Sequence, residues 1–324
     1  MDTYKIVKYD SNHFSIWNDF VSVSKNATFL FHRDFMEYHQ DRFEDYSLLI
    51  YNKNKLVALL PANKNASTIY SHQGLSYGGL ILPDKIDFSS VLNVFYSVLK
   101  FLSENNINKL IIKQFPDIYL NKPSGELEYF LFILKANLFR RDVSLVIDLE
   151  KEITYSKLRK REINRAKREN LKFGEHEDFS LFWNEILTPN LHESYGVLPV
   201  HTLVEINKLK EKFPNHIKQF NVFDGDKILA GCTIFETKNV AHLQYISTNK
   251  AVKKGALDHL IHQLITTVYA GKKYLDFGTS NENEGKQINL GLLKWKQSFG
   301  ASPIVHDFYE VDVENYTLLK TIMI

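Results

Sequence analysis

Apolar and polar residues alternate with two different periods in the second half of the chain, and the changes of period predict its local structure. Residues 241–247 have the composition and alternation of a strand. From 256 to 268 the apolar residues recur at helical spacing, and Gly271 stands where the glycine after a helix is expected. Residues 274–278 give a second short strand pattern, and 290–299 a second amphipathic helix pattern. This stretch is therefore expected to fold as strand, loop, helix, strand and helix.

The remaining patterns describe two similar halves. Residues 46–61 and 217–235 share one layout, two strand-like runs joined by a short polar turn, and Asp224-Gly225 is a strong turn signal. This internal repeat predicts two copies of one fold, with domains at 1–150 and 151–324. Further strands are expected at 5–9, 109–113 and 144–149, and helices at 14–23, 31–38, 91–102, 127–137, 157–168, 179–187 and 202–209.

Composition limits the class of protein. At 324 residues, two domains are favoured over one. The net charge of +2 gives no reason to expect nucleic acid or a membrane surface as the partner of the whole chain. The single cysteine, Cys232, excludes an internal disulfide, and its apolar surroundings favour a buried, unreactive thiol. No signal peptide and no apolar run of about 18 residues is recognised, so a cytoplasmic protein is expected.

The loop before the helix pattern at 256–268 has chemistry that suits an anion. The first turn of a helix leaves backbone N–H groups unpaired, and the helix dipole adds positive potential there. Lys253 and Lys254 add full positive charges, and Gly255 allows close approach to the backbone. A pyrophosphate fits such a site. The alternative is an ordinary strand–helix–strand unit whose lysine pair is simply solvated.

Three motifs in this region resemble a known superfamily. They are Lys-Lys-Gly-Ala at 253–256, Leu-Asp-Phe-Gly-Thr-Ser at 275–280 and Gly-Leu-Leu-Lys-Trp-Lys-Gln-Ser-Phe-Gly-Ala at 291–301. Together they resemble the GNAT acyltransferases, in the Fem-type branch that includes nucleotide-sugar N-acyltransferases, and the resemblance covers most of the chain. It implies an α/β (α+β) fold with two tandem GNAT-like domains, each a mixed, mostly antiparallel sheet flanked by helices.

The resemblance also implies a donor site for coenzyme A, bound as acyl-CoA, in the second domain. The strand that ends at 247 and the loop after it would hold the donor, and the helix N-terminus would hold its pyrophosphate. The residues expected to contact coenzyme A are Ile246, Ser247, Thr248, Lys253, Lys254, Gly255, Ala256, Ser280, Asn281 and Lys294.

Acyl transfer to an amine requires a base and a dipole that polarises the thioester carbonyl. Asp276, which ends a strand beside the expected thioester, is the first candidate for the base, followed by Glu193 and His192. The last two lie within 190–201, which is expected to be a loop between two helices. Backbone groups at 245–247 would polarise the carbonyl. For each side chain, a structural role as a cap or surface residue is the alternative.

The expected acceptor is an amino sugar that lies in a cleft shared by the two domains. The residues expected to contact it are His72, Tyr77, Tyr195, His201, Gln244 and Tyr245. No metal site is expected, because His259 and His262 are spaced three apart on a predicted helix with no third ligand nearby.

These expectations combine into a CoA-dependent N-acyltransferase. Its acceptor would be the amino group of a nucleotide-linked (dTDP- or UDP-) amino deoxysugar, for surface polysaccharide or lipopolysaccharide synthesis. One alternative is a Fem-type transferase, which moves an amino acid from tRNA to a cell-wall precursor and would be expected to carry a long helical-hairpin insertion. Another is a non-catalytic module with a degraded CoA site, because the loop 248–256 lacks the second glycine of the family pattern.

One stretch stands apart by its charge. Residues 157–168 include seven basic side chains among twelve. The run is either a solvated helix face or a clamp for the phosphate groups of a nucleotide or of RNA. It lacks interleaved aromatic residues, so stacking on the bases of single-stranded nucleic acid is not indicated.

Overall fold

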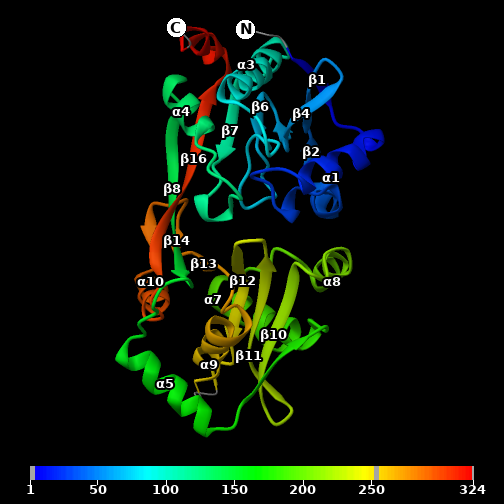
Figure 1. The fold of residues 1–324 in the computed structure, drawn as a ribbon. Helices are drawn as coiled ribbons and strands as arrows, with labels where there is room; N and C mark the ends of the chain where they lie inside the picture. Colours follow the sequence, from blue (N-terminus) through cyan, green and yellow to red (C-terminus); the bar gives the residue numbers. More distant parts are fainter. Residues whose placement is uncertain (1–3, 252–254, 323–324) are drawn as a thin grey trace. The chain divides into compact units, whose positions relative to one another are not determined.

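The computed structural model describes residues 4–251 and 255–322, and it divides into two compact units (Figure 1). Unit 1 contains Met1–Asp142, Glu284–Lys286 and Val305–Ile324, and unit 2 contains Val143–Asn283 and Gln287–Ile304. The sequence prediction placed the domains at 1–150 and 151–324, whereas here unit 2 begins earlier and the C-terminal segment returns to unit 1. The reason is a strand after residue 300, which the sequence prediction lacks and which pairs with a strand of unit 1.

Unit 1 is a mixed α/β fold with one parallel pair of strands. Its strands are β1 (Lys5–Lys8), β2 (Glu44–Asp45), β3 (Leu48–Asn52), β4 (Lys55–Leu60), β5 (Asn63–Asn65), β6 (Thr68–Tyr70), β7 (Lys109–Lys113) and β16 (Ser302–Asp312). Its helices are α1 (Phe14–Ser22), α2 (Arg33–Met36), α3 (Phe88–Glu104) and α4 (Glu126–Ile133), with 3₁₀ turns at Ser11–His13, Phe29–Phe31, Glu37–Arg42, Asp117–Tyr119 and Val313–Thr321. Strands β1, β3 and β4 form one antiparallel sheet, and β2, β5, β6, β7 and β16 follow one another in a second, in which β6 and β7 are parallel.

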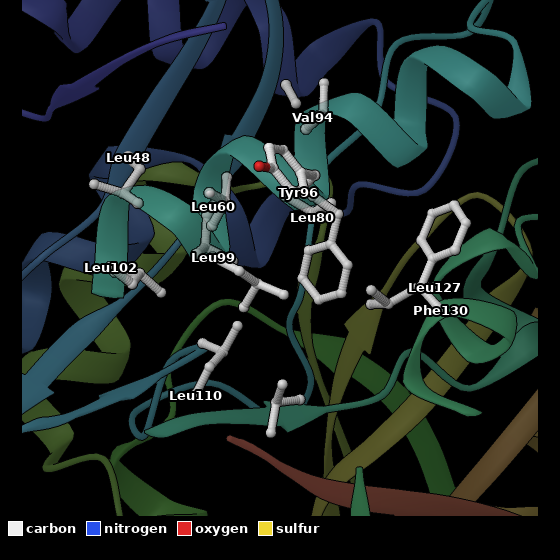
Figure 2. Packing of buried hydrophobic residues seen from close by; sticks show 14 of the residues in the cluster. Leu48, Leu60, Leu80, Val94, Tyr96, Leu99, Leu102, Leu110, Leu127 and Phe130 are labelled. Carbon is white, nitrogen blue, oxygen red and sulfur yellow. The ribbon is translucent and has the colours of Figure 1, made fainter. Parts of the chain in front are cut away.

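Helix α3 is at the centre of the unit 1 core. Its apolar residues recur at helical spacing, so one side of the helix is buried. Each fully buried leucine contributes about 1.5–3 kcal/mol, which fixes α3 on the hairpin β3–β4 and on β7. Figure 2 shows Val94, Tyr96, Leu99 and Leu102 of α3 in one cluster with Leu48, Leu60, Leu80, Leu110, Leu127 and Phe130.

Unit 2 is built on six neighbouring strands of a sheet. In spatial order they are β8 (Asn137–Asp148), whose residues before Val143 belong to unit 1, β13 (Tyr274–Thr279), β12 (Val240–Thr248), β11 (Lys227–Glu236), β10 (Ile217–Asp224) and β9 (Lys172–His176). Its helices are α5 (Lys157–Arg168), α6 (Ser180–Phe182), α7 (Thr188–Tyr195), α8 (Leu203–Lys212), α9 (Ala256–Gln263) and α10 (Leu290–Gln297), with π-helical turns at Trp183–Leu187 and Leu264–Val268 and a small hairpin of β14 (Asn281–Glu282) and β15 (Gln287–Ile288). Only β12 and β13 are parallel neighbours among these strands as described. The order strand, helix, strand, helix predicted for this region is confirmed.

The two faces of the unit 2 sheet differ in chemistry. One face is apolar, carries buried residues such as Cys232 and Leu243, and packs against α9. The opposite face carries Gln219, Thr233 and Tyr245, which stand side by side on β10, β11 and β12. The π-helical turn before α7 packs on this polar face through Trp183, whose ring centroid lies 5.1 Å from that of Tyr245. Catalytic groups are therefore to be sought on the polar face and along its free edges.

The prediction that 190–201 is a loop is wrong for its first half. Helix α7 continues through Tyr195, and the chain leaves it only at Gly196, whose φ of +66° is left-handed. Pro189 lies in the first turn of α7, and it lacks an N–H donor. The π-helical turn directly before α7 lets the helix continue past this proline. His192, Glu193 and Tyr195 consequently lie on a helix.

Candidate active site

Strands β12 and β13 pair over only part of their length. Their parallel ladder consists of Val240 with Tyr274, Ala241 with Leu275 and His242 with Asp276. On its other edge, β12 stays paired with β11 as far as Thr248. The described ladder between β12 and β13 thus stops after His242 and Asp276, six residues before β12 ends. Backbone N–H groups along an edge that has left its neighbour are suitable donors to a substrate carbonyl.

A β-bulge sets the direction of the side chains at this point. Tyr245 stands opposite Thr233 and Leu243 opposite Ile234, so Gln244 is the extra residue of β12. Side chains in a regular strand alternate between faces, and residues three apart would point to opposite sides. Because of the bulge, His242 and Tyr245 instead share the polar face of the sheet.

His242 and Asp276 form a hydrogen-bonded pair at the last rung of the ladder. The Asp276 side chain is buried, with Oδ1 accepting from Ser144 Oγ at 2.7 Å and from the Gly278 amide at 2.8 Å. Its other oxygen, Oδ2, lies 3.0 Å from Nδ1 of His242, whose side chain is 22% exposed. A carboxylate only accepts, so Nδ1 carries the hydrogen and Nε2 of the neutral ring is left as the acceptor. The pair has the geometry of a base held in place by a buried acid.

Lys296 holds the turn that follows β13. Its buried Nζ donates to the carbonyl oxygens of Gly278 at 2.8 Å and Thr279 at 2.6 Å. Burial lowers the pKa of Lys296 to about 8, and the nearby Asp276 carboxylate opposes this shift. Gly278 itself has φ +71°, and a Cβ there would approach Cε1 of His242 to 3.3 Å. Lys296 and Gly278 together leave room for the His242 ring. Lys294, predicted to contact coenzyme A, is exposed on α10.

A surface pocket of about 420 Å³ lies at the N-terminus of α9. Gly255, with φ +68°, precedes the helix, and no side chain caps its first turn in the described structure. The first turn therefore keeps N–H groups available for a ligand. Lys253 and Lys254, predicted for the same site, lie outside the described residues. The pocket is lined by Leu158, Arg159, Glu162 and Arg165 of α5, Thr248, Asn249, Lys250, Gly255, Ala256, Leu257, Asp258 and Trp295.

The basic run predicted at 157–168 is helix α5, and it forms one wall of this pocket. Its buried residues, Ile163 and Ala166, face inward, and Arg159 pairs with Asp258 in the first turn of α9. The two helices approach so closely that a Cβ at Gly255 would lie 2.6 Å from the Glu162 carbonyl oxygen. Glycine is thus required here both by its φ and by the available space.

Two of the residues predicted to contact the acceptor substrate, His201 and Tyr245, contact each other. His201 is buried, and its Nδ1 lies 2.6 Å from the Tyr245 hydroxyl. The His201 amide donates to the same oxygen at 3.1 Å. Burial raises the pKa of Tyr245 to about 12, so the phenol stays protonated. Both side chains act here as a buried link between β12 and the start of α8.

The predicted residues on α7 lie at the surface. His192 and Glu193 are exposed, and Glu193 pairs with Lys250 at 2.8 Å, which lowers the pKa of its carboxyl group. The Tyr195 side chain is 65% exposed. Asn190, one turn earlier, donates to Ser247 Oγ at 2.7 Å and so fastens α7 to the end of β12. Glu193 pairs with Lys250, which lines the pocket at the N-terminus of α9, so the predicted residues of α7 lie beside that pocket and not beside His242.

The remaining predicted residues have structural partners. The Ser280 amide donates to the Val143 carbonyl oxygen on β8 at 3.1 Å. The Val143 amide donates to Asn281 Oδ1 at 2.6 Å. Ile246 packs against the apolar face of the sheet. His72 and Tyr77 are buried within unit 1, where burial lowers the pKa of His72 to about 3 and the Tyr77 hydroxyl lies 3.1 Å from Thr28 Oγ1.

Two further searches concern the described part of the chain alone. Residues 4–251 and 255–322 contain no group of three or more His, Cys, Asp or Glu side chains arranged to hold a metal ion. Within the same residues no helix has the length and apolar character needed to cross a membrane.

Comparison with known proteins places the fold. No family model matches the sequence, and no curated protein matches it either. Among solved structures, FemX matches with a TM-score of 0.65 at 10% identity, over 98% of this chain and 99% of its own. L-PGS from Bacillus licheniformis matches with 0.58 at 12% identity, over 96% and 94%.

A third match bears on the tandem arrangement. It is a tandem GNAT protein from the clavulanic acid biosynthesis pathway, with a TM-score of 0.50 at 9% identity, over 96% of this chain and 98% of its own. At such identities the likeness concerns the fold. Over nearly its whole length the chain therefore has the tandem GNAT-like, Fem-type fold that the motifs predicted.

Proposed function

We propose that this chain is an N-acyltransferase that moves an acyl group from acyl-CoA to the amino group of a nucleotide-linked amino deoxysugar, of the dTDP or UDP type, for surface polysaccharide synthesis. The observation that carries the proposal is the His242–Asp276 pair, held at the point where the ladder between β12 and β13 stops. The His242 imidazole is partly exposed and its tautomer is fixed by Asp276, so it can act as the base. The backbone N–H groups of β12 beyond the ladder can polarise the thioester carbonyl.

The reaction follows from these groups. The amine nitrogen attacks the thioester carbonyl carbon, and backbone N–H groups of β12 beyond His242 stabilise the developing oxyanion. Nε2 of His242 takes the proton that the amine loses, and Asp276 stabilises the resulting imidazolium. The tetrahedral intermediate then collapses: the C=O bond re-forms, the C–S bond breaks, and the thiolate takes up the proton held by the His242 imidazolium and leaves as free thiol.

Asp276 was the first candidate for the base, and the geometry favours a different role for it. Its two oxygens already accept hydrogen bonds from Ser144, Gly278 and His242, and the carboxylate is buried. A base must reach the proton that it removes. We therefore assign proton transfer to His242 and positioning to Asp276. Glu193, with its pKa lowered by Lys250, is a weaker base than an ordinary carboxylate.

The donor is expected in the pocket at the N-terminus of α9. Its pyrophosphate would bind the free amides of the first helical turn, where the helix dipole favours an anion. Arg165 and Lys250 add positive charge at the rim, and Leu257 and Trp295 give apolar walls. Thr248 and Ala256, both expected to contact coenzyme A, line this pocket.

Calorimetric titration with CoA, followed by a panel of nucleotide-linked amino sugars, tests the proposal directly. Binding of CoA and of one such sugar, together with release of free thiol when acetyl-CoA and that sugar are mixed, would support it. A chain with no affinity for CoA would refute it and leave the non-catalytic module or the tRNA-dependent reading.

The second candidate is transfer of an amino acid from tRNA to a cell-wall precursor. Two observations favour it: the basic helix α5 beside the pocket, and the likeness to FemX over 99% of that chain. Residues 4–251 and 255–322 contain no long helical-hairpin insertion, and since FemX is covered almost completely, this does not distinguish the chain from it. Transfer of a radiolabelled amino acid from charged tRNA, with no thiol release from acyl-CoA, would establish this candidate instead.

A further inference from the structure

Helix α5 carries a second surface pocket, outside the donor pocket. It has a volume of about 390 Å³ and is lined by Arg161, Glu162, Arg165, Arg168 and Glu169. Glu162 and Arg165 also line the pocket at the N-terminus of α9. The two pockets therefore adjoin along one helix and share the Glu162 and Arg165 side chains.

The arginine side chains of this second pocket form a stripe. Arg161, Arg165 and Arg168 are spaced i, i+4 and i+7, which places them on one side of the helix about 5 Å apart along its axis. Guanidinium groups present forked N–H donors that match phosphate oxygens. The stripe is therefore shaped for a terminal phosphate rather than for an uncharged group.

The nearby carboxylates do not neutralise the stripe. Glu162 is the one acidic residue in 157–168, and its partly buried side chain lies 3.4 Å from the exposed Arg161 and 3.7 Å from the exposed Arg165. Pairs at such distances with exposed arginine side chains are weak and exchange readily for a phosphate. Arg168 donates to the Asn164 carbonyl at 3.3 Å, and the described residues give it no carboxylate partner. Glu169 adds one further negative charge at the far end.

We propose that Arg161, Arg165 and Arg168 bind the ribose 3′-phosphate of coenzyme A while the N-terminus of α9 binds its pyrophosphate. This inference rests on the proposed function and adds to it a means of selecting coenzyme A over donors that lack the 3′-phosphate. RNA is the less favoured ligand, since the lining of the second pocket contains no aromatic side chain on which a base could stack.

The test compares CoA with 3′-dephospho-CoA by calorimetry at one ionic strength. The wild-type chain should bind CoA about tenfold more tightly than 3′-dephospho-CoA, as expected for one charge-assisted contact. Arg168→Gln should remove most of this difference by weakening CoA alone. Arg165→Gln should weaken both ligands, because Arg165 lines both pockets.

Lys160→Gln is the matched control, since Lys160 lies on the same helix, is exposed and lines neither pocket. It removes the same charge and should leave the tenfold ratio unchanged. A ratio near one in the wild type, or a ratio that falls equally in Lys160→Gln, would overturn the inference while the proposed donor stands. No binding of either ligand would instead overturn the proposed donor itself, and the inference with it.

Discussion

The two units contain the same arrangement, a strand, a helix and a parallel strand, and they complete it differently. In unit 2 the ladder between β12 and β13 stops at His242 and Asp276. In unit 1 the chain after β6 turns back onto β7: Ser71 donates to the Ile111 carbonyl at 2.9 Å, and Gly78 to the Lys113 carbonyl at 2.7 Å. In unit 1 the strand after the helix, β7, is therefore covered by backbone from residues 71–78, whereas in unit 2 the strand before the helix, β12, runs past its described pairing with β13.

A lysine that donates to two backbone carbonyl groups has different consequences in the two units. Lys113 of unit 1 donates to the carbonyl oxygens of Gln73 at 2.9 Å and Leu75 at 2.8 Å, and so ties down the segment that covers β7. Lys296 of unit 2 ties down the turn after β13, next to the open edge. Burial lowers the pKa of each to about 8. In unit 1 these hydrogen bonds hold backbone against β7, and in unit 2 they hold the turn beside His242.

The helices that follow the two strands differ at their first turn. Asp87 caps α3, accepting from the Ser90 amide at 2.8 Å, so a carboxylate already occupies the place of an anionic ligand. Gly255 precedes α9 and contributes no side chain. A repeated fold can therefore keep its architecture in both copies while only one retains free hydrogen-bonding groups for chemistry.

The largest expected effect is a loss of turnover when the His242–Asp276 pair of unit 2 is disrupted. His242→Gln should lower kcat by about 10²–10⁴-fold, the usual contribution of general base catalysis, with CoA affinity unchanged. Asp276→Asn should lower kcat as well, because the amide no longer fixes the ring. Thiol release measured at saturating substrates gives kcat, and calorimetry gives the affinity.

Glu193→Gln is the control for this prediction, since Glu193 is an exposed candidate for the same role. It should keep kcat within about twofold. If Glu193→Gln abolishes turnover and His242→Gln does not, the base lies on α7 and our assignment is wrong.

A second change tests the free helix N-terminus. Gly255→Ala places a Cβ 2.6 Å from the Glu162 carbonyl at a φ of +68°, so α5 and the first turn of α9 must move apart. The Kd for CoA should rise about tenfold, measured by calorimetry. Gly271→Ala, where no atom lies within 4 Å of the new Cβ, should bind CoA like the wild type. Equal affinity in both variants would place the donor elsewhere.

The pH profile tests the role of Lys296. With a pKa of about 8, its ammonium form is present below pH 8 and is lost as the pH rises through that value. Turnover should therefore fall about fourfold between pH 7 and pH 8.5, as the charged fraction falls. Lys296→Arg keeps its charge over this range, so any remaining activity of that variant should lack the fall. A fall of the same size in Lys296→Arg would assign the titration to another group.

The smallest expected effect concerns the closed site of unit 1. Asp87→Ala removes the cap of α3 and should cost about 1 kcal/mol of unfolding free energy, measured by urea denaturation at pH 7. Hydrogen bonds from Ser89 and Ser90 lower the pKa of Asp87 to about 2, so this contribution is present above the ordinary carboxyl pKa. It should shrink as the pH falls from about 4 to 2. Activity should not change, and a loss of activity would mean that the α3 terminus takes part in the reaction.

Much of the fold could be predicted from the sequence because its signals are local. The hairpins β3–β4 and β10–β11 follow from alternation and turn residues, and the helices α3, α8 and α9 from apolar spacing. Thr202 was expected as a possible first residue of a helix, and it caps α8 in a capping box with Glu205. Such features depend on residues within a few positions of each other.

The candidate site was predicted only in part. Asp276 stood out at a strand end, whereas His242 reads as one polar residue of a strand, and the bulge at Gln244 leaves no mark in the pattern. Lys296 lies within the Lys-Trp-Lys motif at 294–296, so the motif was the signal that could have pointed to it. His192 and Glu193 were grouped with the site because their helix was taken for a loop.

By itself the sequence determined most of the strands and helices, with the exceptions of α7 and β16, since period, caps and glycine positions act over short distances. The tertiary structure alone decided that His242 meets Asp276, because their contact depends on the register of two strands separated by a helix. It also decided that α5 forms a wall of the pocket at the N-terminus of α9 and that the last strand returns to unit 1. These are contacts between distant segments, which no local pattern encodes.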